Sequence, residues 1–387
     1  MKKLVMSLVM LLMIAALSAC GSKNNAGSGD KATNDPAKTE APAKSETPAK
    51  SETPAGDTYE LALITDIGTI DDKSFNQGAW EGLKKYAEEN NIAYKYYQPT
   101  EKSTTAYVSA IDLAVSAGAK LVVCPGFLFE PAVYEAQTKY PEIKFILLDG
   151  TPHTEDYATF KIESNVYSVF YAEEQAGFLA GYAAVKDGYK KLGFMGGMAV
   201  PAVIRFGYGF VQGADYAAKE LGLDSIDVKY HYTGGFDATP EVQATAASWY
   251  QEGTEVIFAC GGAVGNSVMT AAKGAEKKVI GVDVDQSAES ETVITSAMKQ
   301  LSISVYDGIK KYYANEFPGG KSVTLDVTVD GVALPMENSK FTTFTQNDYD
   351  AIFAKLVSGE IKPVKDTDVE AADKITVEKV KVQVIAE

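Results

Sequence analysis

The sequence predicts an α/β protein with two doubly wound, Rossmann-like lobes on either side of a hinged ligand cleft. Short apolar runs alternate with amphipathic helical stretches, a pattern typical of βαβ units around a parallel sheet. This pattern occurs twice, and 387 residues are more than one hydrophobic core usually holds. Several runs end in Asp or Gly, which favours ligand binding because parallel strands present their carboxyl ends to such a cleft.

The first series of elements begins near Thr58. Its expected strands are 61–65, 94–98, 121–125, 145–149 and 159–163. Helical patterns between the first four strands begin at Ser74, Thr104 and Pro131. After the first strand comes a polar loop, in which Asp72 or Ser74 can cap the helix that follows.

The second series opens with a predicted helix over 167–186. Its expected strands are 192–195, 228–232, 256–259 and 279–282, with helices from about Pro201, Pro240 and Gly265. After Val293 we expect a strand, a helix over about 301–315, a further segment over 322–335 and a last helix near 347–357. We therefore assign 58–165 with about 294–325 to the N-terminal lobe, and 166–293 with about 326–387 to the C-terminal lobe.

The first 20 residues are typical of a targeting segment. Two lysines precede an apolar run over 4–16 that is too short to span a membrane, which predicts a signal peptide over 1–19. The residues Leu-Ser-Ala-Cys20 resemble a bacterial lipobox, which implies cleavage before Cys20 and acylation of its thiol, for example with palmitate. The alternative is an ordinary signal peptide in which Cys20 is incidental. With the lipid attached, the protein would be anchored to the extracytoplasmic face of the cell membrane.

Residues 20–57 are rich in Pro, Lys, Glu, Ala, Ser and Thr and hold almost no large apolar side chain. A six-residue repeat starts at Pro36, Pro42 and Pro48. Such a composition cannot form a core, and regular prolines favour extended backbone. We predict a disordered tether between the lipid and the folded body.

Charge and composition exclude several classes of function. A formal net charge of -16 and a pI near 4.7 argue against nucleic-acid binding, which needs a basic face. The sequence has no Gly-x-x-x-x-Gly-Lys-Ser/Thr phosphate loop. His153 and His231, both expected in surface loops, form no recognisable metal or Ser-His-Asp site. We therefore expect no metal, no cofactor and no catalytic residue.

Cys124 and Cys260 occupy matching strand ends in the two series. They lack the paired spacing of a metal site. Buried free thiols suit such strands, because Cys behaves as a small hydrophobe, and a disulfide between the two is the alternative.

Three expected strands end in a carboxylate, at Asp66, Asp149 and Asp283. Each alone suits a helix cap or a loop anchor, but together they indicate a site. A carboxylate accepts hydrogen bonds only, so it can hold the vicinal hydroxyls of a sugar. Lys299 is the cation expected near the cleft, with a solvated surface position as its alternative. Gly262 lies in a Gly-Gly turn that allows close approach of a ligand to the backbone.

Four segments resemble the basic membrane protein family, the purine nucleoside-binding lipoproteins of bacterial ABC transporters. These segments are 66–77 (DIGTIDDKSFNQ), 200–210 (VPAVIRFGYGF), 281–286 (GVDVDQ) and 295–299 (TSAMK). The resemblance implies a type I periplasmic-binding-protein fold without enzymatic activity. It further implies a monomer that binds a purine nucleoside such as adenosine, guanosine or inosine and delivers it to an ABC permease.

The resemblance also assigns roles to residues. Phe75 resembles a ring that stacks on the purine, and Asp66 and Asn76 resemble groups that bind the base. Phe236 resembles the opposing ring, although its flanking residues depart from the commoner family form, and Phe206 is the alternative. The set that resembles the ribose-holding residues is Asp149, Gly262, Asp283 and Lys299.

Two other functions remain open on the sequence. An enzyme such as a nucleoside hydrolase would need a carboxylate cluster around a cation or a nucleophile with its base, and we find neither. A binding protein or sensor for another small solute, such as a sugar or a signalling molecule, would share the fold.

Overall fold

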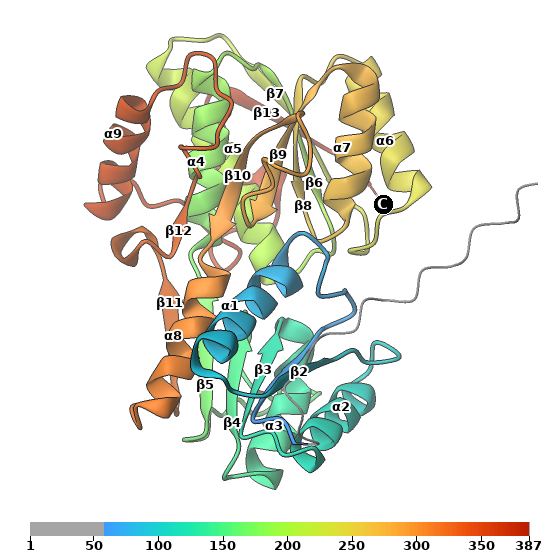
Figure 1. Ribbon diagram of the computed structural model, residues 1–387. Coiled ribbons are helices and arrows are strands. Elements are labelled where there is room, and N and C mark those ends of the chain that lie inside the picture. Colours follow the sequence, from blue (N-terminus) through green and yellow to red (C-terminus); the bar gives the residue numbers. More distant parts are fainter. Residues whose placement is uncertain (1–57, 387) are drawn as a thin grey trace, which may run out of the picture. The chain divides into compact units, whose positions relative to one another are not determined.

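The computed structural model describes residues 58–386, whose strands form two sheets (Figure 1). The predicted signal peptide, Cys20 and the tether over 20–57 lie outside the described residues. Among residues 58–386, no helix is long and apolar enough to cross a membrane.

The first lobe is built on a parallel sheet with the strand order β11-β5-β4-β3-β1-β2. Its strands are β1 (Leu61–Ile64), β2 (Tyr94–Tyr97), β3 (Leu121–Pro125), β4 (Lys144–Leu148), β5 (Val166–Tyr171) and β11 (Lys321–Leu325). One face is covered by α1 (Phe75–Asn90) and α8 (Leu301–Tyr313), and the other by α2 (Thr104–Ser116) and α3 (Glu130–Lys139).

Strand β1 shows why this sheet is apolar on both faces. Leu61 and Leu63 belong to the core under α1, whereas Ala62 and Ile64 belong to the core under α2 and α3. Successive side chains of a strand point to opposite faces, so a strand covered on both faces is a continuous apolar run.

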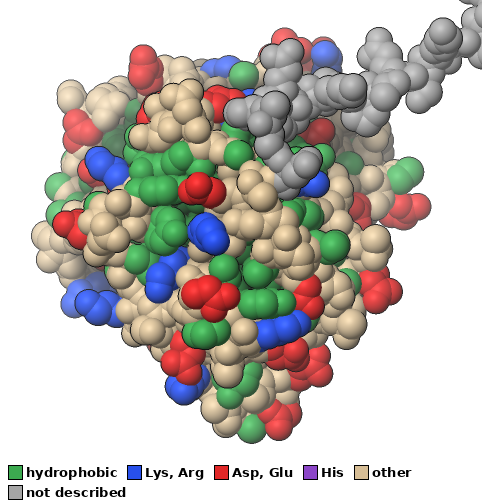
Figure 2. Space-filling view, turned by 60° about the horizontal axis from the view of Figure 1, so that its bottom comes forward, with side chains coloured by type: hydrophobic (Ala, Val, Ile, Leu, Met, Phe, Trp, Pro, Cys, Tyr) green, Lys and Arg blue, Asp and Glu red, His purple; other side chains and the backbone are tan. Residues whose placement is uncertain are grey.

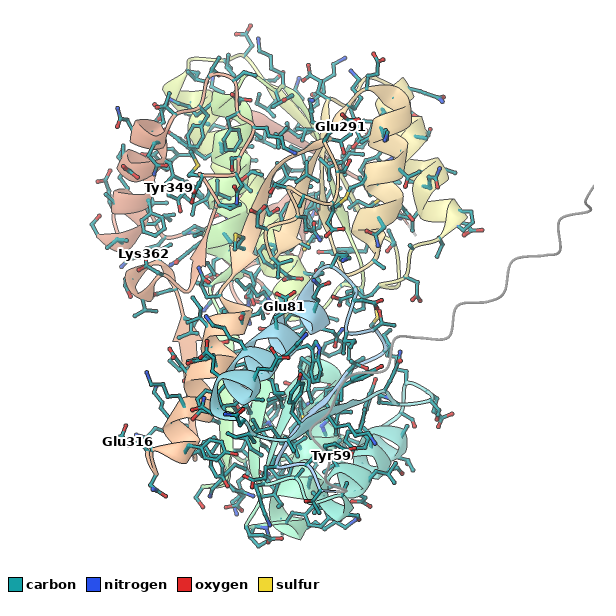
Figure 3. All side chains as sticks on the ribbon, viewed as in Figure 1. Tyr59, Glu81, Glu291, Glu316, Tyr349 and Lys362 are labelled. Atoms are coloured by element: carbon teal, nitrogen blue, oxygen red, sulfur yellow. The ribbon has the colours of Figure 1, made fainter. Side chains whose placement is uncertain are left out.

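The second lobe is built on a mainly parallel sheet with the order β12-β10-β9-β8-β6-β7-β13, in which β12 pairs antiparallel with β10. Its strands are β6 (Lys191–Gly196), β7 (Ile226–Tyr232), β8 (Val256–Cys260), β9 (Lys278–Asp283), β10 (Val293–Lys299), β12 (Val332–Ala333) and β13 (Val380–Val384). Its helices are α4 (Glu173–Lys186), α5 (Pro201–Glu220), α6 (Pro240–Gln251), α7 (Val264–Ala275) and α9 (Gln346–Val357). Side chains fill the space between the sheets and their helices (Figure 3).

Helices α4 and α5 run side by side with their backbones in contact. A Cβ added to Gly177 on α4 would lie 2.0 Å from the Phe206 carbonyl oxygen, and one added to Gly209 on α5 would lie 2.0 Å from the Glu174 carbonyl oxygen. Glycine is therefore required at this crossing. The two helices run parallel, so their first turns lie near each other.

Three chain segments connect the two sheets. They are the turn from β5 to α4 at Ala172, the turn from β10 to α8 at Gln300, and the segment 326–331 between β11 and β12, which contains the short helix η2 (Val327–Val329). Backbone hydrogen bonds join these crossovers: Ala172 donates to the Leu325 carbonyl and Gln300 to the Gly331 carbonyl, each over 3.0 Å.

Most predicted elements match the structure to within two residues at each end, but two predictions were wrong. No strand occurs over 159–163, where His153 and Phe160 form only an isolated bridge. The run over 167–171, predicted as the start of a helix, belongs to strand β5. Its β-branched and aromatic residues favour a strand, and helix α4 begins only at Glu173.

The lobe boundaries shift with these elements. Strand β5 lies in the first sheet, although the predicted second lobe began at 166, and β10 lies in the second sheet, although 294–325 was assigned to the first lobe. The prediction placed the last strand of the first series at 159–163, which is too early in the chain. The observed strand, β5, therefore fell after the predicted lobe boundary at 166.

On the face shown in Figure 2, Lys and Arg side chains are interspersed with Asp, Glu and uncharged side chains. Positive charge therefore does not gather into one patch on that face.

Candidate ligand-binding site

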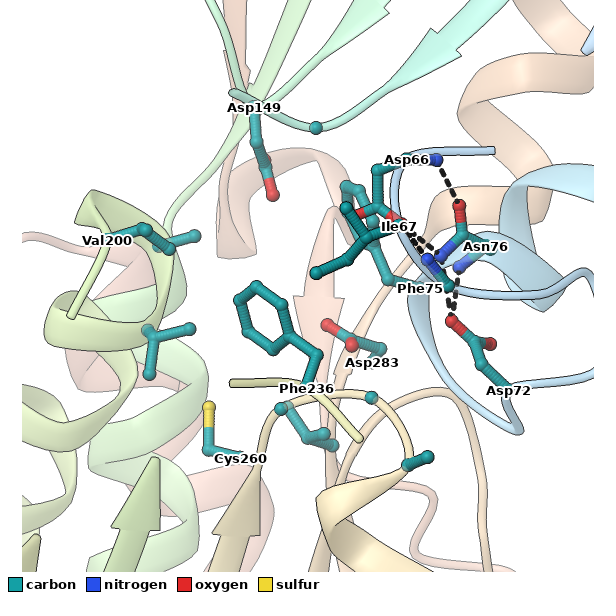
Figure 4. Close-up of a pocket in the computed structure, with 18 of the residues that line it drawn as sticks. Asp66, Ile67, Asp72, Phe75, Asn76, Asp149, Val200, Phe236, Cys260 and Asp283 are labelled. Atoms are coloured by element: carbon teal, nitrogen blue, oxygen red, sulfur yellow. Dashed lines mark hydrogen bonds between the residues drawn. The ribbon is translucent and has the colours of Figure 1, made fainter. Parts of the chain in front are cut away.

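A cavity of about 250 Å³ lies where strand ends of the two sheets face each other. All the side chains and turns predicted to bind the ligand line this one cavity: Asp66, Phe75, Asn76, Asp149, Phe236, Gly262, Asp283 and Lys299. Phe206, the alternative ring, lines it as well. The sequence-predicted set is thus brought together in space. Figure 4 shows six of these residues around the cavity: Asp66, Phe75, Asn76, Asp149, Phe236 and Asp283.

The first wall is the loop 66–77, here called the first-lobe loop, which joins β1 to α1. Asp72 is its organising residue, because its carboxylate accepts the backbone N–H groups of Ser74 (2.8 Å), Asn76 (3.0 Å) and Gln77 (3.1 Å). The side chain of Ser74 makes no cap hydrogen bond to the described part of the chain. Of the two capping residues predicted, Asp72 is the one that satisfies the N–H groups at the helix start.

Asn76 links Asp72 to Asp66. Its amide nitrogen donates to the carboxylates of Asp66 (2.9 Å) and Asp72 (3.0 Å), and its amide oxygen accepts the Asp66 N–H. The backbone N–H of Gly68 also donates to Asp66 over 2.7 Å. Burial raises the pKa of Asp66, and these hydrogen bonds oppose that rise. Asp66 is therefore fixed in position at the edge of the cavity.

The rings at the cavity differ in exposure. Phe75 and Phe236 are partly buried, whereas Phe206 is only 1% exposed and its ring meets that of Phe258 edge-on at 5.9 Å. Phe236 fits against a glycine backbone, because a Cβ at Gly197 would lie 2.4 Å from its ring. Phe236 points into the cavity in Figure 4.

Lys299 is buried at the centre of the site, which excludes the surface position that was its alternative. Its ammonium lies 2.5 Å from an Asp149 oxygen and 3.1 Å from a Glu173 oxygen. It also lies over aromatic rings, 4.8 Å from the centre of Phe75 and 5.4 Å from that of Phe206. Its pKa is raised, because the nearby carboxylates outweigh the effect of burial.

Asp149 and Asp283 share an uncommon backbone conformation. Their φ angles are +54° and +66°, in the left-handed region, which Asp tolerates better than most residues. The Oδ1 atom of Asp149 is buried and has no hydrogen-bond partner within residues 58–386. An acceptor of this kind is costly to leave unsatisfied, so it is suited to a hydroxyl donor from a ligand.

Asp283 contacts the opposite lobe. The Ser74 hydroxyl donates to Asp283 Oδ2 over 2.5 Å, and the Gln286 side chain donates to the Lys73 carbonyl over 2.7 Å. Burial raises the pKa of Asp283, while Lys299 lowers it. The segments 66–77 and 281–286, which carried the resemblance, therefore meet across the cleft.

The remaining predictions concern cysteine and histidine. Cys124 and Cys260 are free and buried, as predicted, and burial raises the pKa of both thiols. The prediction that both histidines lie in surface loops was wrong. His153 is 1% exposed and lies 3.1 Å from Glu130, and His231 is on β7. Within residues 58–386, no cluster of His, Cys, Asp or Glu could hold a metal ion.

Sequence reasoning missed three polar residues around the site, namely Ser74 as a cross-cleft donor, Glu173 and Gln286. Ser74 and Gln286 lie inside segments 66–77 and 281–286, which carry the family resemblance. Their place in these segments could therefore have indicated a role at the site. Glu173 follows an aromatic strand that was predicted as helix, and nothing local indicates its burial.

The family model described as PnrA-like ABC transporter substrate-binding protein matches residues 59–367. The chain is 32% identical over 301 residues to the "ABC transporter nucleoside-binding protein BmpA" of Lactococcus lactis subsp. cremoris, covering 72% of this chain and 82% of the relative. It is 30% identical over 311 residues to "Basic membrane protein A" of Borreliella burgdorferi, covering 78% and 86%.

Solved structures agree on the fold. An ABC transporter solute-binding protein from Aeropyrum pernix superposes with a TM-score of 0.71 at 26% identity, covering 81% of this chain and 95% of that one. One from Conexibacter woesei gives 0.63 at 22% identity, covering 80% and 99%. The predicted type I periplasmic-binding-protein fold is confirmed. The matches also indicate a role in substrate binding for a transporter, outside the cytoplasm, rather than in catalysis.

Proposed function

Since the chain belongs to the family of PnrA-like ABC transporter substrate-binding proteins, we propose that it captures purine nucleosides, such as adenosine, guanosine or inosine, and delivers them to an ABC permease. The family implies a small-molecule ligand and a permease partner. The Lactococcus relative is named as a nucleoside-binding protein, which supports a nucleoside as the ligand class.

The purine base stacks between Phe75 and Phe236 in this proposal. Both rings line the cavity and are partly exposed to it, whereas Phe206 is already packed against Phe258. A base on an aromatic side chain gains about 1 to 3 kcal/mol from stacking. Asp66 and Asn76, which also line the cavity, bind the polar edge of the base.

In the same proposal, the ribose binds to a second set of polar residues that line the cavity, namely Asp149, Asp283, Lys299 and the backbone at Gly262. The observation that carries the proposal is the buried Oδ1 of Asp149, which has no partner within residues 58–386 and lies at a cavity that also holds partly exposed rings. A ribose hydroxyl can satisfy this acceptor, and an analogue without the hydroxyl would leave it unpaired.

The proposal extends to the N-terminus, which lies outside the described residues. After removal of 1–19, acylated Cys20 anchors a monomer to the extracytoplasmic face of the membrane, and 20–57 tether the folded body. Mass spectrometry of protein extracted from its native membrane tests both ends of the proposal. It should find an acylated N-terminal Cys20 and a bound purine nucleoside carried through purification.

Calorimetry with nucleosides, free bases and ribose tests the ligand class on the purified protein. We expect Phe75→Ala and Asp283→Ala each to weaken nucleoside binding by about tenfold or more while the fold is kept, because stacking and the hydroxyl contacts are lost. Phe160→Ala, at an exposed ring outside the cavity, is the matched control and should bind normally. Equal binding of ribose and guanosine, or full affinity in folded Asp283→Ala, would contradict the proposal.

A further inference from the structure

Glu173 is a buried carboxylate directly behind the cavity. It is the first residue of α4, immediately after the crossover from the first sheet, and its side chain is 1% exposed. Within residues 58–386 no neutral group donates a hydrogen bond to either of its oxygens. It is held instead by two cations, Lys299 at 3.1 Å and Arg205 at 3.6 Å.

Lys299 is divided between two carboxylates that belong to different lobes. Asp149 follows β4 of the first sheet, so the ion pair between Lys299 and Asp149 connects the lobes. Glu173 lies on α4, which packs against α5 and β10, and Lys299 ends β10. The pair between Lys299 and Glu173 therefore lies within the second lobe, next to two of the crossovers.

We propose that Glu173 is a positioning residue that holds the Lys299 ammonium at the ribose end of the cavity. The inference rests on the proposed function, because it concerns the same site. A buried ammonium needs a counter-charge. With Glu173 in place, Asp149 carries only part of that task, and its second oxygen stays available to a ligand hydroxyl. Without Glu173, Asp149 is the carboxylate left in ion-pair contact with Lys299 among residues 58–386, and it turns further towards the ammonium.

The surroundings of Glu173 make its charge sensitive to pH. The titratable and charged groups that act on it are Lys299 of β10, Asp149 after β4, Arg205 of α5, Tyr171 of β5, Glu174 of α4, Cys260 of β8 and Asp283 of β9. Burial raises the pKa of Glu173, and the two cations oppose that rise. As the pH falls through this raised pKa, Glu173 loses its charge, and its hold on Lys299 weakens.

Nucleoside affinity of Glu173→Gln across pH 5 to 8 tests the inference. We expect affinity about tenfold weaker than wild type at the alkaline end, as for the loss of one partner of a buried charge pair. The difference should shrink towards the acid end, where the wild-type carboxyl is itself protonated. Glu173→Asp, which keeps the charge, should recover part of the affinity. The titration of Asp66 is common to both proteins and cancels in the comparison.

A double-mutant cycle with Lys299→Met separates this role from a purely structural one. If Glu173 acts through Lys299, Glu173→Gln causes no further loss of affinity in the Lys299→Met background. A further loss there, or equal affinities of wild type and Glu173→Gln at every pH, overturns the inference. Should Glu173→Gln alone not fold, the comparison of Lys299→Met with the double variant decides.

Failure of the inference about Glu173 can be distinguished from failure of the proposed function. A wild-type protein that binds no nucleoside contradicts the proposed function. In that event, the unfolding free energies of the same four ligand-free proteins decide the inference. Coupling between the two substitutions supports the hold of Glu173 on Lys299, and additivity overturns it.

Discussion

The two walls of the cavity are built in different ways. In the first-lobe loop, 66–77, the carboxylate of Asp72 accepts the N–H groups of its own helix start, so the loop is held by bonds within one lobe. The turn 283–286 of the second lobe also has internal bonds, since the Val282 N–H donates to the Gln286 side chain and the Gln286 N–H donates to the Ser296 hydroxyl. It bonds across the cleft as well, to the Ser74 hydroxyl and the Lys73 carbonyl. Asp72 thus works within its own lobe, whereas Asp283 accepts its side-chain hydrogen bond from the opposite lobe.

This difference suggests how ligand binding and lobe closure are linked. A preformed wall can offer Phe75 to a ligand without rearrangement, which reduces the ordering cost of binding. The contacts of Asp283 and Gln286 exist only when the lobes are close together. A ligand touched by both walls binds this arrangement better and shifts the population towards it.

The largest effect is expected where the self-contained wall is broken. Asp72→Ala leaves the N–H groups at the start of α1 without their acceptor, and Asp72 is only 7% exposed. We expect a loss of about 2 kcal/mol or more in unfolding free energy, together with weaker nucleoside binding, because Phe75 is the first residue of that helix. Chemical denaturation and calorimetry measure the two effects.

The neighbouring Asp71 supplies the matched control for Asp72. It is exposed and lies one position earlier in the same loop. Asp71→Ala should change stability by less than about 0.5 kcal/mol. Equal losses in both variants would show that the loop does not depend on Asp72.

The sequence predicted most of the first wall and part of the second. Asp66, Asp149 and Asp283 could be found because strand ends of parallel sheets meet at one edge, and the resemblance added the rings. Local pattern alone reduced the helix cap to Asp72 or Ser74, and the structure shows that Asp72 fills this role. The cross-cleft donors could not be found in this way, because no rule of spacing relates Ser74 to a residue 209 positions away.

The predictions from sequence were wrong where tertiary contacts override the local sequence pattern. Strand β5 was predicted as helix because its apolar residues run directly into α4. The burial of Glu173 depends on the crossover that this error concealed. The left-handed backbone of Asp149 and Asp283 likewise reflects the turn that each strand must make, which sequence alone does not reveal.

A smaller effect is expected from removing one bond between the walls. Ser74→Ala deletes the hydroxyl that donates to Asp283, a hydrogen bond to a carboxylate worth about 1 kcal/mol or more. We expect about fivefold weaker nucleoside binding with nearly unchanged stability, because the first-lobe loop keeps its own hydrogen bonds. Calorimetry measures the affinity, and small-angle scattering of the ligand-free protein should show a larger radius of gyration than that of wild type.

Ser109→Ala, on the exposed face of α2, is the control for Ser74→Ala. Unchanged affinity in Ser74→Ala would mean that this bond does not help closure.

The smallest effect is expected at the rim of the same contact, where Lys73 and Glu289 form an ion pair of 3.7 Å with side chains 40% and 34% exposed. Water and salt screen such a pair, whose typical contribution is about 0 to 1 kcal/mol. Glu289→Gln should therefore weaken nucleoside binding by less than about twofold, and the small difference should vanish at high salt. Calorimetry at low and high ionic strength measures it. An effect as large as that of Ser74→Ala would contradict the comparison between the walls, since closure would then depend on surface charge rather than on the buried bonds of Asp283 and Gln286.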